Sequence, residues 1–134
     1  MGLSSGILLI TLYNNVENIS PFFIVLLLWY PCFENLFSIL RKYKFNSSPL
    51  EPDNKHFHQL LFNYLKKKLN YSNLFTNNLS SILINVFNLF IFFIASKDIF
   101  SSRLQISLIF LSILTYGFLY FKLFSFRFKI KKKA

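Results

Sequence analysis

The chain has 134 residues, of which 54% are hydrophobic and 20% aromatic, yet its formal net charge is +10. This length allows one domain. The composition is too apolar for a disordered chain, and Cys32 is the single cysteine, which excludes a disulfide scaffold. The apolar residues form four blocks with the charges between them, a pattern that predicts an all-α polytopic membrane protein rather than a soluble domain.

The first apolar block covers residues 2–12. It has about half of the ~20 residues that a membrane-spanning helix needs. It also lacks the basic start and the small-residue cleavage site of a signal peptide. We therefore expect a short first span, resembling the end of a longer helix.

The second block, residues 21–40, is long enough to span a membrane. Pro31 removes a backbone donor inside it and predicts a kink. Glu34 follows in the inner half of the span, where a carboxylate is costly. Two interpretations remain open: Glu34 belongs to a functional site, or it is structural and pairs with Arg41, about two helical turns further on.

The third and fourth blocks, residues 79–95 and 104–121, are each near spanning length. Neither block contains a residue pattern that suggests chemistry. The sequence thus predicts about four transmembrane helices, the first of them short.

The basic residues predict the orientation of these spans. Seven Lys and Arg residues lie in the segment 41–78 and six lie after Phe121, so thirteen of the fifteen fall in two segments. Four crossings place both segments on one side, which the positive-inside rule assigns to the cytoplasmic face of the inner (plasma) membrane. We expect the tail, 122–134, to attract anionic phospholipid. No nucleic-acid recognition fold surrounds it, so we expect no nucleic-acid partner.

The cytoplasmic loop 41–78 contains a predicted helix. Pro49 and Pro52 hold the backbone extended, and Asp53 is placed to cap a helix that follows. Apolar residues then recur at helical spacing, which predicts an amphipathic helix in the membrane interface. These residues are Phe57, Leu60, Leu61, Tyr64, Leu65 and Leu69.

Both histidines of the chain, His56 and His58, lie at the start of this helix. Two residues apart, they do not share a helical face, and without further ligands they fall short of a zinc site. They are either solvated residues at a helix start or part of a site for a phosphate-bearing ligand. In the second case Lys55, free backbone amides, Arg41 and Lys42 contribute to the same site.

A family resemblance favours the second interpretation. The segment 48–60, SPLEPDNKHFHQL, resembles the S-P-x-x-P-D-x-x-H-x-H-[HQ]-L loop of the polyprenyl-phosphate sugar-1-phosphate transferases, the glycosyltransferase family 4 membrane enzymes. Residues 30–38, followed by Arg41 and Lys42, are similar to the helix that precedes that loop. Two spans and a basic tail follow the loop, which resembles the undecaprenyl-phosphate N-acetylglucosamine-1-phosphate transferase type.

The resemblance implies transfer of a sugar 1-phosphate from a UDP-sugar to polyprenyl phosphate, with release of UMP and with Mg²⁺, in cell-envelope polysaccharide synthesis. It implies that His56 and His58 contact the nucleotide sugar and that Asp53 holds the loop. Lys55 and the basic pair Arg41 and Lys42 are further candidate substrate-binding residues.

The sequence also departs from the family. The aspartates that the family uses for catalysis and for Mg²⁺ do not occur in this chain, so we expect no catalytic residue and no metal ligand here. The chain then resembles a C-terminal fragment, inactive without its N-terminal portion. Two alternatives stay open: a small stand-alone four-span protein such as a lipid-linked sugar flippase or accessory subunit, and a cationic membrane scaffold. A flippase has no evident need for the histidine motif.

Overall fold

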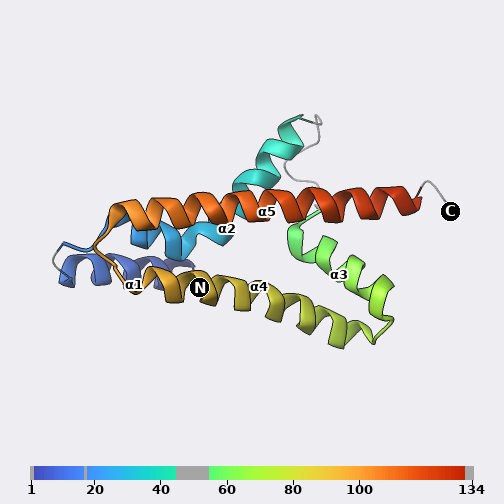
Figure 1. The fold of residues 1–134 in the computed structure, drawn as a ribbon, viewed down its shortest axis with the longest axis horizontal. Coiled ribbons are helices and arrows are strands. Elements are labelled where there is room, and N and C mark those ends of the chain that lie inside the picture. The colour runs from blue at the N-terminus through green and yellow to red at the C-terminus, as the bar shows by residue number, and fades with distance from the viewer. Residues whose placement is uncertain (1, 17, 45–54, 132–134) are drawn as a thin grey trace.

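The computed structural model describes residues 2–16, 18–44 and 55–131, and the described part of the chain is helical without strands. Five helices follow in order (Figure 1). They are α1 (Gly2–Asn15), α2 (Pro21–Lys44), α3 (Phe57–Leu69), α4 (Asn73–Ala95) and α5 (Ser102–Lys131). The all-α prediction is confirmed for these residues.

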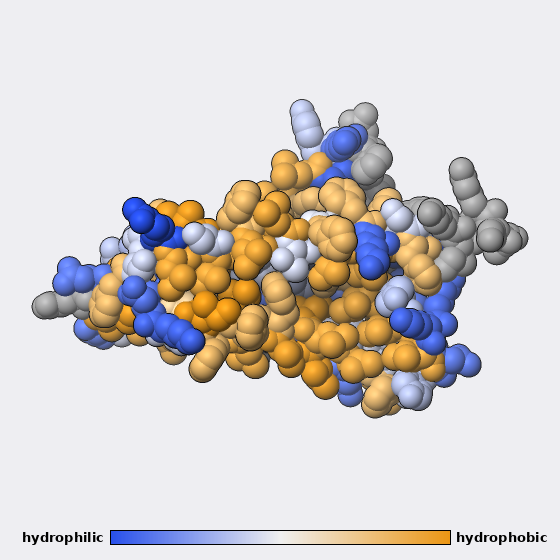
Figure 2. All heavy atoms as spheres, in the orientation of Figure 1, coloured by the Kyte–Doolittle hydropathy of each residue, from blue (hydrophilic) through white to orange (hydrophobic). Residues whose placement is uncertain are grey.

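Three of the helices are long and apolar enough to cross a membrane: α2, α4 and residues Ser102–Arg127 of α5. Helix α1 has 14 residues. At about 1.5 Å per residue it is too short for the ~30 Å hydrocarbon core of a bilayer. The predicted count of four spans is therefore not confirmed. Apolar side chains cover the middle of the molecule, while hydrophilic ones gather at both ends (Figure 2).

The helices extend beyond the predicted blocks. Helix α4 begins at Asn73, because Ser72 caps it: the Ser72 hydroxyl accepts a hydrogen bond from the Phe75 amide (3.3 Å). Helix α5 continues to Lys131, so the predicted basic tail is largely helical. This extension packs against α3, with the rings of Tyr64 and Phe126 4.9 Å apart. Both ends of the predicted loop 41–78 are helical, because α2 continues to Lys44 and α4 begins at Asn73.

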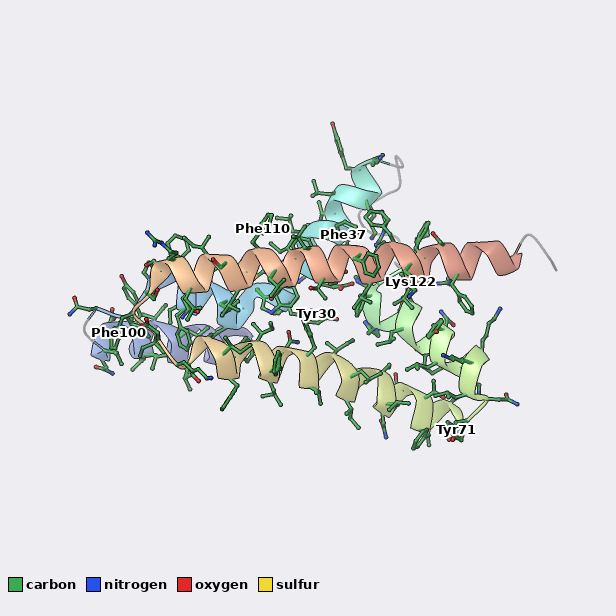
Figure 3. The ribbon with its side chains drawn as sticks, in the orientation of Figure 1. Tyr30, Phe37, Tyr71, Phe100, Phe110 and Lys122 are labelled. Atoms are coloured by element: carbon green, nitrogen blue, oxygen red, sulfur yellow. The ribbon has the colours of Figure 1, made fainter. Side chains whose placement is uncertain are left out.

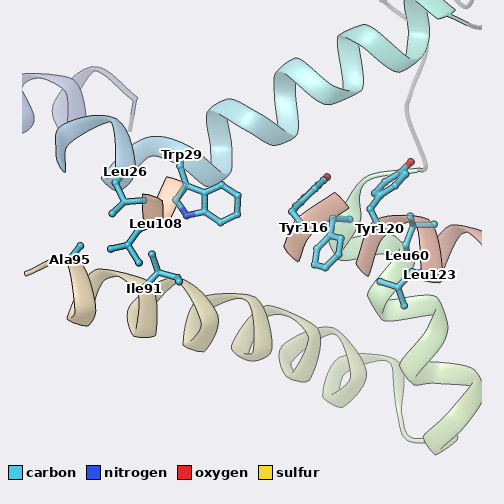
Figure 4. Close-up of a cluster of buried hydrophobic side chains, with 10 residues drawn as sticks. Leu26, Trp29, Leu60, Ile91, Ala95, Leu108, Tyr116, Tyr120 and Leu123 are labelled. Atoms are coloured by element: carbon cyan, nitrogen blue, oxygen red, sulfur yellow. The ribbon is translucent and has the colours of Figure 1, made fainter. Parts of the chain in front are cut away.

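Helix α2 changes direction just past Trp29 (Figure 4). Pro31 lies inside the helix at this point, where its ring and missing N–H favour a bend. The predicted kink is confirmed. Its consequence is that the second half of α2 leaves α4 and crosses α5 (Figure 1), where Phe37 packs on the ring of Tyr120 (4.8 Å between ring centres).

Helices α4 and α5 form a hairpin that opens away from its turn, and α3 lies across the open end (Figure 1). Buried side chains hold this arrangement in two groups along the hairpin (Figure 4). The group near the turn contains Leu26, Trp29, Ile91, Ala95 and Leu108. The group near α3 contains Phe57, Leu60, Tyr116, Tyr120 and Leu123. The predicted apolar face of α3 is confirmed in part: Phe57, Leu60 and Leu65 are buried and Leu61 and Tyr64 are partly buried, whereas Leu69 is 38% exposed.

The α4–α5 turn depends on a buried amide. Gln105 is fully buried, and its Nε2 donates to the carbonyl oxygens of Ala95 (3.1 Å) and Asp98 (2.8 Å). Gln105→Leu leaves both carbonyls without this donor, so we expect the free energy of unfolding to fall by about 1 to 3 kcal/mol. Unfolding in mixed micelles measures this, with Ser107→Ala as a control at an exposed hydroxyl. An effect no larger than that of the control would contradict the expectation.

Candidate functional site

The carboxylate of Glu34, on the second half of α2, has three hydrogen-bond partners, two at the start of α3 and one on α5. Its Oε1 accepts from the backbone N–H of Phe57 (2.9 Å) and lies 3.0 Å from Nδ1 of His56. Its Oε2 accepts from the hydroxyl of Tyr116 on α5 (2.6 Å). The Glu34 side chain is only 12% exposed. One carboxylate therefore joins three helices.

This geometry offsets the cost of burying a charge. A carboxylate in a poorly solvated position is tolerated when donors surround it, and α3 adds the positive end of its dipole. The Phe57 amide and the Tyr116 hydroxyl are donors to this carboxylate, and Nδ1 of His56 is a third donor in the tautomer that carries its proton on that nitrogen. The expectation of free backbone amides at the helix start is wrong for Phe57, whose N–H is bound by Glu34.

Arg41 makes a second connection between α2 and the residues that precede α3. Its guanidinium donates to the carbonyl oxygen of Lys55 (3.1 Å) and to the hydroxyl of Tyr120 (2.6 Å). The Tyr120 hydroxyl also donates to the Lys55 carbonyl (3.2 Å). The guanidinium carbon lies 5.6 Å from the centre of the Tyr120 ring and 5.9 Å from that of Phe37. The Glu34 carboxylate lies beside Nδ1 of His56 (3.0 Å), and its predicted pairing with Arg41 remains only a prediction.

Two pairs of residues at helical spacing therefore fix the start of α3. Glu34 and Arg41 are two turns apart on α2, and Tyr116 and Tyr120 are one turn apart on α5. The fourth apolar block, in which we saw no pattern that suggests chemistry, supplies both tyrosine hydroxyls of this group. The signal in the sequence is the four-residue spacing of two tyrosines in an apolar span, since their hydroxyls need partners there.

The two histidines lie close together despite their spacing. His56 is the N-cap residue of α3 and has an extended backbone (φ −63°, ψ 150°), so helical geometry does not separate its ring from that of His58. The two rings are nearly parallel, with 15° between their planes and 6.1 Å between their centres. His58 is exposed and lines a cavity of about 560 Å³ together with Gln59, Phe62, Asn63, Asn73, Leu74, Asn77 and Arg127.

The structure brings together most of the residues predicted to bind a phosphate-bearing ligand. Arg41, Lys55, His56 and His58 lie at the junction of α2 and α3. Lys42 lies beside Arg41 in the last turn of α2 and is half-buried. Asp53 lies outside the described residues, and the N-cap position that we predicted for it belongs to His56.

Mg²⁺ does not fit the part of the chain that the structure describes. No three His, Cys, Asp or Glu side chains gather there. Glu34 is occupied by its three donors, and Asp98 lies in the α4–α5 turn, where its Oδ1 accepts from the amides of Phe100 (3.2 Å) and Ser101 (3.1 Å).

Comparisons with protein-family models, with curated proteins and with solved structures find no match for this chain. The fold defines it as an all-helical protein, within the described residues, with three helices able to cross a membrane by length and composition.

Proposed function

We propose that the chain is the C-terminal part of a glycosyltransferase family 4 membrane enzyme. Such an enzyme transfers a sugar 1-phosphate, for example N-acetylglucosamine 1-phosphate, from a UDP-sugar to polyprenyl phosphate. The loop 41–78 and the end of α5 face the cytoplasm of a plasma membrane, and His56 and His58 contact the nucleotide sugar. The motif in residues 48–60 and the cluster around His56 support this proposal.

The observation that carries the proposal is the fixed position of His56. Its Nδ1 is held by Glu34 (3.0 Å), which leaves Nε2 as the atom available to a ligand. A carboxylate that orients one nitrogen of a histidine is a common way to prepare the other for binding or catalysis. The parallel ring of His58 lies beside it, and Arg41 and Lys55 add positive charge. A diphosphate with its negative charges suits this group of donors.

Catalysis and Mg²⁺ binding in such an enzyme require residues outside this chain. The described residues offer no carboxylate cluster for Mg²⁺, so the catalytic carboxylates and the metal would come from an N-terminal portion. We therefore propose that the chain alone has no transferase activity. Its role in the complete enzyme is to position the nucleotide sugar near the membrane surface.

Binding of UDP-N-acetylglucosamine to the purified chain in nanodiscs tests the proposal. Saturation-transfer NMR should show contact with the UDP moiety and none with free N-acetylglucosamine, because the site binds phosphate. The double variant His56→Ala/His58→Ala should weaken the signal at least tenfold, since hydrogen bonds to charged groups contribute ~1.5 to ~3 kcal/mol each.

Lys97→Gln is the matched control, because Lys97 lies in the turn at the opposite end of α4 and its ammonium contacts the Phe93 ring (5.6 Å). This variant removes one positive charge and should leave binding unchanged. Equal signals from the wild-type chain and the double histidine variant would contradict the proposal and favour an accessory or scaffold role.

A further inference from the structure

A second cavity, of about 670 Å³, lies between α2, α3, α4 and α5. Its size is within the ~300 to ~1,000 Å³ of cavities that hold small molecules. Its lining is mainly aromatic and aliphatic, with one charged side chain, Lys122. Tyr30 of α2 and Lys122 of α5 both line this cavity, and both lie on the side of α5 that faces α3 and α4 (Figure 3).

This cavity opens onto the apolar outer surface of the helices. Leu83 of α4 and Leu119 of α5 line it, and they are 46% and 39% exposed. The outer faces of the same two helices are strongly apolar and exposed, as at Phe90 (61%) and Phe118 (69%). In a membrane these faces contact lipid, so a molecule that enters the cavity from the side is an apolar chain of the bilayer.

The position of Lys122 indicates which class of lipid the cavity favours. Lys122 is exposed and lies near the end of α5 that packs against α3, where the amphipathic helix marks the membrane interface. Among the described residues, no ion pair joins Lys122 to a carboxylate. An apolar cavity with an unpaired ammonium at the level of the headgroups is complementary to a lipid with a negatively charged phosphate.

We propose that this cavity binds one acyl chain of an anionic phospholipid, with the lipid phosphate at Lys122. Lipid tails are as apolar as leucine, so burial of the acyl chain in the cavity contributes little net affinity. The positive charge of Lys122 therefore determines which lipid headgroup is preferred. One lysine near the surface then favours an anionic over a zwitterionic lipid about fivefold, which corresponds to ~1 kcal/mol. This site requires membrane insertion only and stands apart from the proposed transferase function.

Trp29 provides the probe for this site. It is the only tryptophan of the chain, lines the cavity and is 4% exposed. Bromine on an acyl chain quenches tryptophan fluorescence on contact, and a buried indole is reached only by a chain inside the cavity. In nanodiscs of equal composition, brominated phosphatidylglycerol should quench Trp29 with about fivefold higher apparent affinity than brominated phosphatidylcholine.

Three variants decide the outcome. Lys122→Gln should abolish the preference for phosphatidylglycerol, whereas Lys67→Gln, which removes an exposed lysine of α3, should preserve it. The double variant Leu83→Phe/Thr115→Phe narrows the cavity from α4 and α5 and should reduce quenching by both lipids.

Equal quenching by the two lipids in the wild-type chain, or a preference that survives Lys122→Gln, would overturn the proposal. Recovery of fluorescence by undecaprenyl phosphate at a lower mole fraction than by unbrominated phosphatidylglycerol would also overturn it, because the cavity would then belong to the polyprenyl acceptor.

Discussion

Glu34→Ala is expected to lower the free energy of unfolding by about 2 to 4 kcal/mol, because three donors lose their acceptor at once. The N–H of Phe57, Nδ1 of His56 and the hydroxyl of Tyr116 all meet this carboxylate. Hydrogen bonds within membrane proteins average ~0.6 kcal/mol, and those to charged groups in general reach ~1.5 kcal/mol or more. Denaturation in mixed micelles, followed by circular dichroism, measures the loss.

Asp98→Ala is the matched control for Glu34→Ala. Asp98 also accepts two backbone hydrogen bonds, from Phe100 and Ser101, but it does so in an exposed turn. Water replaces those bonds after the substitution, so we expect a loss of about 1 kcal/mol or less. Glu34→Gln retains one acceptor oxygen, so its loss in the free energy of unfolding should lie between those of Glu34→Ala and Asp98→Ala. If Glu34→Ala and Asp98→Ala have equal effects, Glu34 does not hold α3 in place.

The sequence predicts the apolar elements of this fold well, because hydrophobic pattern and length depend on local residues alone. The blocks around Trp29, Ile91 and Leu108 all lie in helices, and Pro31 coincides with the bend of α2. Helix ends are predicted less well. In helix α5, which continues to Lys131, Phe126 packs on Tyr64 of α3, and that contact between distant segments has no local signal.

Several residues of the candidate site are predicted from the sequence, but the contacts between them are not, because those contacts join distant segments. The motif points to His56 and His58, and the intramembrane carboxylate rule points to Glu34 as a residue that needs a partner. The connection between them depends on tertiary structure. Residues 34 and 56 meet only because α2 bends and α3 folds back toward α5, where Tyr116 completes the group. The spacing of residues in the sequence does not specify this contact between Glu34 and His56.

The proposed transferase function predicts activity in a hybrid enzyme. A chimera in which this chain replaces the corresponding C-terminal spans of an N-acetylglucosamine-1-phosphate transferase should release UMP from UDP-N-acetylglucosamine. His56→Ala and His58→Ala should each raise the KM for the nucleotide sugar ~10- to ~100-fold, the range expected for loss of a charge-assisted hydrogen bond. Lys97→Gln, at the far turn, should leave KM unchanged.

UMP release by the purified, monodisperse chimera is the most direct test that this chain supplies the nucleotide-sugar site of a transferase. We expect activity well above that of the same enzyme lacking its C-terminal spans, and we expect it to depend on both histidines. A monodisperse chimera with no activity above the deletion control, or one whose KM is unaffected by either histidine substitution, would contradict the proposed function.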